Sequence, residues 1–373
     1  VREHIGKRAS LLFLLFVWIS LLYEIVAFTD LTASTFLAEK YGAGVATSSL
    51  LYLLLAVLMG LLFRHTTLPL PAVTICGIVM IVLIIWGGQH IPITLPAVSF
   101  LSPAKAWGIL ILGYCFFASI LPVWMLLQPR GFLGGYFLYG ALIIGVVGLF
   151  FGGYKAEYPA FIGLQNPKGA FLFPALFITI ACGACSGFHG LVCGGTSSKQ
   201  LDKEGDAHPV GYGGMLLEGL VAVIALATIM MFAKGDPALA KGPTEIYAQG
   251  LGHFASLLGV PMGMAMSFGL LAFATFVYDT LDVATRLGRY IFQELTGWQG
   301  KGGRIGATLA TLALPLLFLM TTQEAAYLKF WPIFGASNQL LAALSLLGIS
   351  VWLIKTGRNP WYTLIPMFFL LSI

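Results

Sequence analysis

The chemistry available to this sequence resides in a few ionisable side chains within otherwise apolar stretches. If such a stretch crosses a lipid bilayer, an ionisable group inside it costs about 2.5–3.5 kcal/mol on insertion scales, so it requires a partner or a function. A desolvated carboxylate can titrate near neutral pH and carry a proton, and histidine changes its charge between about pH 5 and 8. The residues concerned are Glu24, Asp30, His189, Glu218, Asp279 and Asp282.

Structural and chemical roles compete for the first three carboxylates. Glu24 lies deep in its apolar stretch, where it is either an ion-coupling group or a buried hydrogen-bonding group. Glu218 lies inside another stretch, where it either carries a proton or packs as a neutral acid against a neighbouring helix. Asp30 lies near the end of its stretch and is better explained as a structural residue at the membrane interface.

Asp279 and Asp282 lie near the end of a long apolar stretch that becomes polar in its last third. A solvated helix end explains Asp279, which is also a further candidate for ion coupling. Asp282 and Arg286 are spaced i and i+4, so they share one face of a helix. We interpret these two residues as a structural pair or a cytoplasmic gate, and not as ligands of a bound molecule.

A glycine-rich stretch interrupts another apolar segment. Five glycines fall within thirteen residues between Gly183 and Gly195, together with Ser186 and His189. Because glycine favours backbone outside helical geometry, we predict that residues 182–196 are unwound and line a cavity. Unwound backbone at membrane depth is tolerated only where protein or a water-filled cavity surrounds it. The alternative is a glycine-rich packing interface that holds a hydrogen-bonded histidine.

Cys182 and Cys185 form a C-x-x-C pattern, which in other proteins serves redox or metal chemistry. With His189 and Cys193 the pair has the composition of a zinc site. The pattern lies in an apolar segment without a second C-x-x-C, so small packing side chains explain it better. Walker, dinucleotide-binding and HExxH motifs are absent from the sequence. We therefore expect no metal, no cofactor and no catalytic residue.

Composition identifies the elements that must position these side chains. The 373 residues are 58% hydrophobic and only 9% charged, whereas an ordinary soluble domain is about 25% charged. Continuous apolar runs of about 20 residues indicate membrane-spanning helices, and the short alternating strands of a membrane barrel do not occur. The net charge of +5 comes without a Lys/Arg-rich run, so nucleic acid is not an expected partner.

The sequence thus predicts an all-α protein, a polytopic transmembrane helical bundle with about eleven segments. Short connections, many with proline or glycine, leave no room for a soluble domain, so we expect one membrane domain over residues 1–373. The expected segments are 10–33, 46–63, 70–86, 106–127, 132–151, 171–187, 211–232, 262–283, 305–320, 334–353 and 361–373.

Lysine and arginine set the expected orientation. With the N-terminus in the cytoplasm and eleven alternating segments, thirteen of the twenty basic residues fall on the inner side. All eight arginines are among them, including Arg130, which this scheme places in the connection between the fourth and fifth segments. Because basic residues are enriched in cytoplasmic loops, the split supports both the segment count and the orientation.

Several long stretches resemble the carbon starvation protein A family of bacterial transporters. One runs from the broken segment, FLFPALFITIACGACSGFHGLVCGGTSSKQL, and others cover residues 206–226, 279–295 and 330–347. The resemblance implies a proton-coupled secondary active transporter that imports peptides or a small carboxylate such as pyruvate across the bacterial inner membrane. It also implies a broken-helix core like that of the amino acid–polyamine–organocation superfamily.

The sequence departs from that family in two respects. Family members carry a glycine-rich helix with a His-His pair before this point, and the chain stops inside an apolar segment, so we expect it to lack N-terminal and C-terminal family segments. Family positions in the broken segment are more often aliphatic or serine than cysteine. Cys185 and Cys193 are therefore local variants, which argues against a metal site.

Under this interpretation the candidate residues take three roles. Substrate contacts come from the broken segment and from a neutral pair at the start of a later segment. The expected substrate-binding residues are Gly183, Ser186, Gly187, His189, Gly190, Asn338 and Gln339, and the expected ion-coupling residues are Glu218 first, then Glu24 and Asp279. The rival functions are a membrane redox or metal-binding subunit that uses Cys182, Cys185 and His189, and a channel.

The orientation can be tested by cysteine labelling. We expect the N-terminus and the loops at 197–209 and 296–304 to be cytoplasmic, because arginines and the denser lysines lie on those sides. A membrane-impermeant thiol reagent applied to intact cells should therefore miss single cysteines introduced at positions 199 and 301. Efficient labelling at both positions would contradict this topology.

Overall fold

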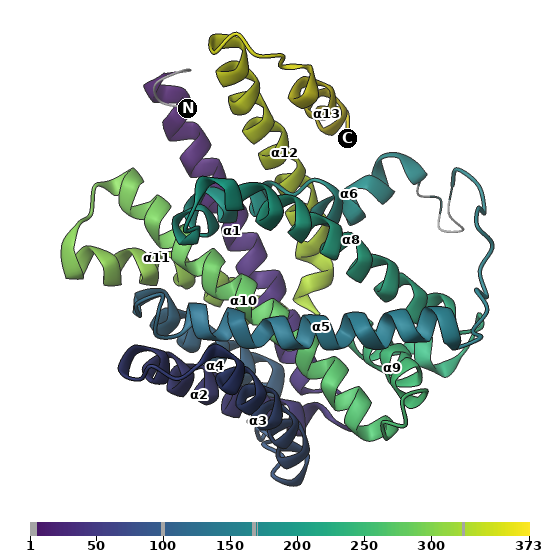
Figure 1. The fold of residues 1–373 in the computed structure, drawn as a ribbon. Coiled ribbons are helices and arrows are strands. Elements are labelled where there is room, and N and C mark those ends of the chain that lie inside the picture. The colour runs from purple at the N-terminus through teal and green to yellow at the C-terminus, as the bar shows by residue number, and fades with distance from the viewer. Residues whose placement is uncertain (1–5, 98–100, 166–168, 170, 323–324) are drawn as a thin grey trace. The chain divides into compact units, whose positions relative to one another are not determined.

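A computed structural model describes residues 6–97, 101–165, 169, 171–322 and 325–373. Within these residues the chain forms thirteen α-helices and three short 3-10 helices (Figure 1). Extended pairing in the described part is limited to an isolated bridge between Gln165 and Phe171. The predicted all-α fold is confirmed.

Nine helices in the described ranges are long and apolar enough to cross a membrane. All nine fall on predicted segments, and large apolar side chains such as Phe150 and Tyr362 are exposed on the helices, as a lipid environment permits. These helices are α1 (Lys7–Phe36), α2 (Gly42–His65), α3 (Leu70–His90), α4 (Pro103–Ile120), α5 (Leu127–Phe151), α8 (Ala207–Met230), α10 (Met262–Thr296), α11 (Gly300–Thr321) and α12 (Ala326–Lys355).

Two predicted segments are built differently from a single long helix. The segment 171–187 contains α6 (Leu172–Ala184) and the start of α7 (Gly187–Gly195), and 361–373 contains the short α13 (Trp361–Leu371). The total of eleven segments therefore stays a prediction, while the multi-pass helical architecture is established.

The chain divides into two compact units, each described by itself. The first unit comprises residues 1–27, 160–219 and 283–373, and the second comprises 28–159 and 220–282. The boundaries fall inside α1, α8 and α10 and in the connection after α5. A single domain over residues 1–373 stays a prediction.

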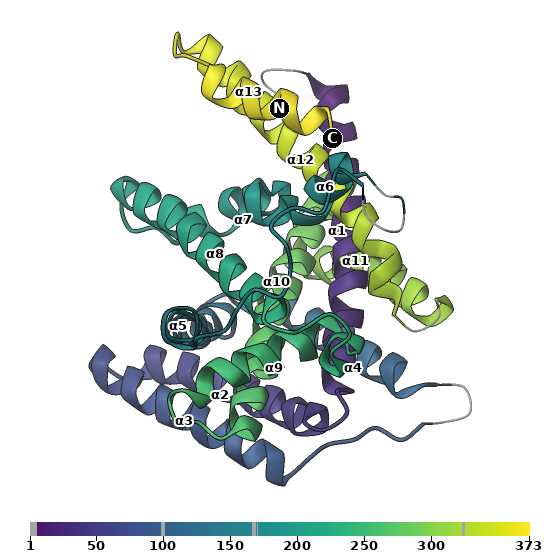
Figure 2. The same cartoon turned by 90° about the vertical axis from the view of Figure 1, so that its right-hand side faces the viewer.

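In the first unit, α12 packs against α6, α7 and α13. Figures 1 and 2 both show α13 beside α12, and a small buried cluster joins the two helices through Ala342, Ala343, Met367 and Leu370. The Trp18 indole donates a hydrogen bond of 3.2 Å to the Thr311 hydroxyl, which ties α1 to α11.

In the second unit, α2 packs beside α3, and α5 packs against α2 and α9 (Pro243–Ser256). Small residues and side-chain hydrogen bonds make these contacts. The Ser48 hydroxyl on α2 donates to the carbonyl of Ile84 on α3 at 3.0 Å. Gly148 on α5 lies directly against the Phe254 ring of α9, so no larger side chain fits there.

Two features of this unit differ from the prediction. Helix α9 was not predicted because it is too short and too polar for a span, although Pro243 at its first turn is a helix-start signal. Helix α5 begins at Leu127 and contains Arg130, so the placement of Arg130 in a connection was wrong. The turn before α5 comes early because Pro122 follows the end of α4, and proline disfavours helical geometry in the residue before it.

Candidate functional site

The break between α6 and α7 is confined to Cys185 and Ser186. Ser186 has extended backbone angles, φ −94° and ψ 125°, and its hydroxyl accepts a hydrogen bond from the His189 amide at 3.1 Å. The first amides of a helix have no partner within the helix, so a serine at this position caps α7. The sequence at the break therefore stops one helix and starts the next.

Asn338 of α12 fastens the start of α7. Its side-chain oxygen accepts hydrogen bonds from the Phe188 amide at 2.8 Å and from the Ser186 hydroxyl at 3.2 Å. These two donors fix which end of the amide group accepts and which end donates. Asn338 is 2% exposed. Its Nδ2 atom is buried and has no hydrogen-bond acceptor within bonding distance in the described part of the chain, and the Cys182 side chain is near enough to interact with it.

Glycine has different functions along the broken segment. A Cβ atom on Gly187 would lie 2.5 Å from the backbone of Asn338 and Ala342, so this glycine permits the close contact of α7 with α12. Gly183 has open space around its Cβ position, and Gly190 has only the Ser345 hydroxyl nearby at 3.9 Å. Among the glycines predicted to bind substrate, Gly183 and Gly190 are therefore the two that have room beside them.

The prediction that residues 182–196 are unwound was wrong in extent. The break exists, but residues 187–195 form the helix α7 in spite of four glycines. Glycine weakens a helix by roughly 1 kcal/mol per residue relative to alanine. The Ser186 cap and the contact of Gly187 with α12 offset that weakness.

The structure brings His189 of α7 and Glu218 of α8 together. The His189 Nδ1 atom lies 3.7 Å from the Glu218 Oε2 atom, and the two side chains are 48% and 39% exposed. The sequence assigned them separate roles, whereas the structure makes them one pair next to the capped start of α7. The spacing of residues along the sequence could not predict this pair, because the two residues belong to different helices.

Glu24 and Gln339 occupy buried positions in the same unit. Glu24 is 2% exposed and interacts electrostatically with Cys182 of the broken segment. The Gln339 amide nitrogen donates to the Phe177 carbonyl of α6 at 2.6 Å, so it holds α6 against α12. A direct contact of Gln339 with substrate stays a prediction.

The cysteines of this segment make no metal constellation in the described residues. The Cys182 sulfur lies 3.6 Å from the Ser186 hydroxyl, and Cys185 packs beside the buried cluster of α12 and α13. Among the described residues, no group of three His, Cys, Asp or Glu side chains is placed to hold a metal ion.

A buried ion cluster lies in the second unit and is centred on Arg130, which is 0% exposed. The Arg130 guanidinium forms an ion pair with Asp282 and lies 3.2 Å from the Asp279 carboxylate. It also donates to the Tyr114 hydroxyl at 2.5 Å and to the Thr275 carbonyl at 3.3 Å. One guanidinium thus serves two carboxylates.

Two tyrosines complete this cluster. The Tyr114 hydroxyl donates to the Asp282 carboxylate at 2.7 Å, and the Tyr52 hydroxyl donates to the Arg130 carbonyl at 2.8 Å. Such hydrogen bonds are what a desolvated ion pair requires. Helices α2, α4, α5 and α10 each contribute at least one group.

The cluster changes two expectations from the sequence. Asp279 is not a solvated helix end, because it faces Arg130. Asp282 has Arg130 and Tyr114 as partners, and its pairing with Arg286 as a gate stays a prediction. Sequence analysis missed Arg130 as a site residue. The sequence does contain a signal for this residue. Arg130 lies at the edge of one apolar run, and two carboxylates lie inside another, so an ion pair between the two runs could have been predicted.

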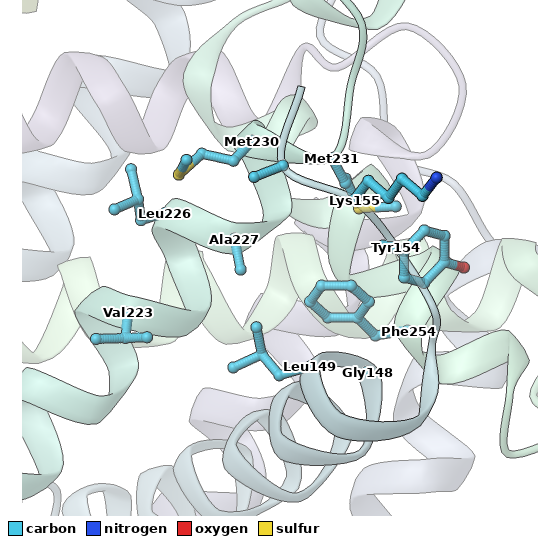
Figure 3. A pocket seen from close by; sticks show the side chains of 11 residues that line it. Gly148, Leu149, Tyr154, Lys155, Val223, Leu226, Ala227, Met230, Met231 and Phe254 are labelled. Carbon is cyan, nitrogen blue, oxygen red and sulfur yellow. The ribbon is translucent and has the colours of Figure 1, made fainter. Parts of the chain in front are cut away.

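A separate cavity of about 260 Å³ lies in the second unit (Figure 3). Its walls come from the end of α5, the end of α8 and Phe254 of α9, and they are mostly apolar. Lys155 supplies a charge at its edge, as the close-up shows. None of the predicted site residues lines this cavity, so it is not the candidate site.

Fold and site together define a multi-pass, all-helical membrane protein. One of its helices is broken, and the buried side-chain amide of Asn338 accepts hydrogen bonds at the break. A family model described as "Carbon starvation protein CstA" matches residues 1–239 and 233–373. The chain belongs to the CstA family. The family expectation from the sequence is confirmed.

Relatives carry transporter names. "Peptide transporter CstA" of Helicobacter pylori is 31% identical over 86% of this chain and 56% of its own length. "Peptide transporter CstA" of Mycobacterium tuberculosis is 33% identical over 78% and 48%. "Pyruvate/proton symporter BtsT" of Escherichia coli is 30% identical over 80% and 54%.

The chain spans about half the length of the curated relatives it matches. The names of these relatives describe transport and not catalysis, which supports the expectation that the chain is not an enzyme. No solved structure shows a significant match to the chain.

The Arg130 cluster predicts a large effect on stability. Arg130→Gln would leave the buried Asp282 carboxylate and the partly exposed Asp279 carboxylate without their cation, so we expect a loss of about 3–5 kcal/mol. Thermal unfolding of the detergent-purified protein measures this as a lower Tm. Adding Asp282→Asn to Arg130→Gln should restore part of the loss. Arg64→Gln is the control, because Arg64 is exposed and stacks on Trp124. Equal Tm values for Arg130→Gln and Arg64→Gln would contradict the cluster.

A second prediction compares two glycines of α7. Gly187→Ala should lower the Tm, because its Cβ would lie 2.5 Å from the backbone of α12. Gly190→Ala should leave the Tm unchanged or raise it, because its Cβ meets open space and alanine favours a helix by roughly 0.5–1 kcal/mol. The same unfolding experiment measures both variants. If Gly187→Ala is as stable as Gly190→Ala, the close contact of α7 with α12 is wrong.

Proposed function

We propose that this chain is part of a proton-coupled secondary active transporter that imports a small carboxylate-bearing molecule, a peptide or pyruvate. The observation that carries the proposal is the α6–α7 break, where Asn338 holds the start of α7 and keeps a buried amide nitrogen that has no acceptor within hydrogen-bond distance among the described residues. Discontinuous helices of this kind form substrate sites in many transporters. The names of the relatives support the same class of function.

The chemistry of the break suits a carboxylate. The start of a helix carries a partial positive charge, and the Asn338 amide nitrogen supplies a hydrogen-bond donor next to it. His189, when protonated, adds a full charge on the first turn of α7. A peptide and pyruvate both present a carboxylate at neutral pH, so this single feature accommodates the substrates named for either kind of relative.

The His189–Glu218 pair provides a way to couple a proton to that carboxylate. With histidine neutral and glutamate ionised, the pair is negative and repels the substrate. Each proton that the pair takes up makes it one charge more positive, and so favours the bound carboxylate. Coupling of two binding events is reciprocal, so a bound carboxylate also favours the bound proton. Glu218 is therefore our first candidate for proton coupling.

Asp279 is the second candidate. The Arg130 cluster holds two carboxylates and one guanidinium, so it is neutral only when one carboxyl group is protonated. Asp282 has the tighter set of partners, which leaves Asp279 as the group that takes the proton. Glu24, buried near the broken segment, is the third candidate.

The cellular location of the protein and its superfamily stay predictions from the sequence. We place the protein in the bacterial inner membrane with the N-terminus of this chain in the cytoplasm. The broken helix supports a likeness to the amino acid–polyamine–organocation superfamily. The names of the relatives favour transport over the rival redox or metal-binding function.

Transport by proteoliposomes tests the proposal. We expect vesicles that contain the protein to accumulate labelled pyruvate or dipeptide when the external pH is lower than the internal pH, and to lose accumulation when the gradient is collapsed. A channel would equilibrate the label without accumulating it. An absence of flux for both substrates would contradict the proposal.

Two matched variants identify the coupling carboxylate. Glu218→Gln should abolish accumulation against a gradient and retain exchange of labelled for unlabelled substrate, because substrate still binds. Asp279→Asn should retain accumulation if Glu218 carries the proton. The reverse pattern would move the coupling site to the Arg130 cluster, and full accumulation in both variants would exclude both groups.

A further inference from the structure

Three cationic side chains lie around Tyr290 in the first unit, and a fourth lies near one of the three. Arg286 and Arg289 come from the same helix, α10, and Lys199 comes from the 3-10 helix Ser197–Gln200. The Arg289 guanidinium stacks on the Tyr290 ring at 4.4 Å, and the Lys199 ammonium lies 5.9 Å from the same ring centre. Arg304 of α11 is close enough for its charge to act on Arg289. We call these five residues the Tyr290 cluster.

Burial makes this concentration of charge expensive. Arg289 is 3% exposed and Arg286 is 5% exposed, while Lys199, Tyr290 and Arg304 face the surface. Within the described part of the chain, Arg289 has no carboxylate at salt-bridge distance, and its Nε atom is buried without a hydrogen-bond partner. A buried guanidinium without a counter-charge costs several kcal/mol.

The depth of the cluster is indicated by aromatic side chains at the same end of α10. Phe292 packs against Trp18 at 5.2 Å and against Trp298 at 5.7 Å between ring centres. Tryptophans are enriched where a membrane meets water. The cluster therefore lies near an interface, at the level where lipid headgroups are found.

We propose that the Tyr290 cluster is a binding site for a phosphate-bearing anion. Arginine pairs with phosphate through two parallel hydrogen bonds, and basic pockets between membrane helices bind anionic headgroups. The exposed Lys199 and the 42% exposed Tyr290 form the outer edge of the cluster, where an anion from the surface would meet it. The shared ligand chemistry is a phosphate group, on either an anionic phospholipid or a soluble phosphate ester.

This site is separate from the break between α6 and α7. Its charges lie on α10, α11 and the 3-10 helix after α7, and none of its members is a proposed substrate or coupling residue. Arg286 belongs to the predicted gate pair with Asp282, so the tests below use Arg289 and Lys199 instead. The inference does not depend on the transport proposal.

Calorimetric titration of the detergent-purified protein tests the site with three probes. They are dihexanoyl phosphatidylglycerol, dihexanoyl phosphatidylcholine and sn-glycerol 3-phosphate. We expect phosphatidylglycerol to bind at least about tenfold more tightly than phosphatidylcholine, because only the first carries net negative charge. If glycerol phosphate binds as tightly as phosphatidylglycerol, the ligand is a soluble anion. If glycerol phosphate binds more weakly, the ligand is a lipid headgroup.

Variants locate the binding. Arg289→Gln should weaken binding of the tighter anion about tenfold or more, and Lys199→Gln should weaken it several-fold without disturbing the core, because Lys199 is exposed. Lys203→Gln is the matched control, since Lys203 is an exposed cation of the same loop. Equal affinities in Lys199→Gln, Lys203→Gln and the unaltered protein would overturn the site. So would the absence of any preference for phosphatidylglycerol or glycerol phosphate over phosphatidylcholine.

Discussion

Lipid offers no hydrogen bonds, so every interruption of a membrane helix must find its partners inside the protein. The hydrogen bonds from Phe188 and Ser186 to Asn338 meet that requirement at the α6–α7 break. Without them the amide of Phe188 at the start of α7 would lose its partner. The same contact brings Gly187 against α12 and sets the position of His189 one turn on, so the geometry of the candidate site depends on one buried amide.

The same constraint explains the second polar centre. Arg130 is an expensive residue to bury, and it is tolerated because two carboxylates, the Tyr114 hydroxyl and the Thr275 carbonyl surround its guanidinium. The two centres differ in accessibility. The His189–Glu218 pair is about half exposed, as expected of groups that exchange protons with water, whereas the Arg130 guanidinium is fully enclosed. Asp279 is itself 31% exposed, so exposure does not separate the two carboxylates, and Glu218 comes first as a coupling candidate because its partner is a titratable histidine.

Much of the architecture was predictable from the sequence because apolar length alone specifies membrane helices. The break was also predictable, since Ser186 and its neighbouring glycines are poor helix interior residues. The length of the unwound stretch was not predictable, because Asn338, which stabilises the start of α7, lies 152 positions from Ser186 along the chain. The pairing of Arg130 with Asp282 was missed for the same reason. Local sequence patterns predict where helices end. Pairs of side chains from helices far apart in the sequence depend on packing, which a single sequence does not show.

We propose that the amide nitrogen of Asn338 receives the carboxylate of the substrate. Asn338→Asp tests it most directly, because aspartate keeps the oxygen that caps α7 and replaces only the donor. The measurement is the Kd for pyruvate or dialanine, with the corresponding amides as neutral comparisons. We expect a folded Asn338→Asp protein to bind the acid at least about tenfold more weakly, with a smaller change for the amide. Equal affinity for the acid in both proteins would contradict it.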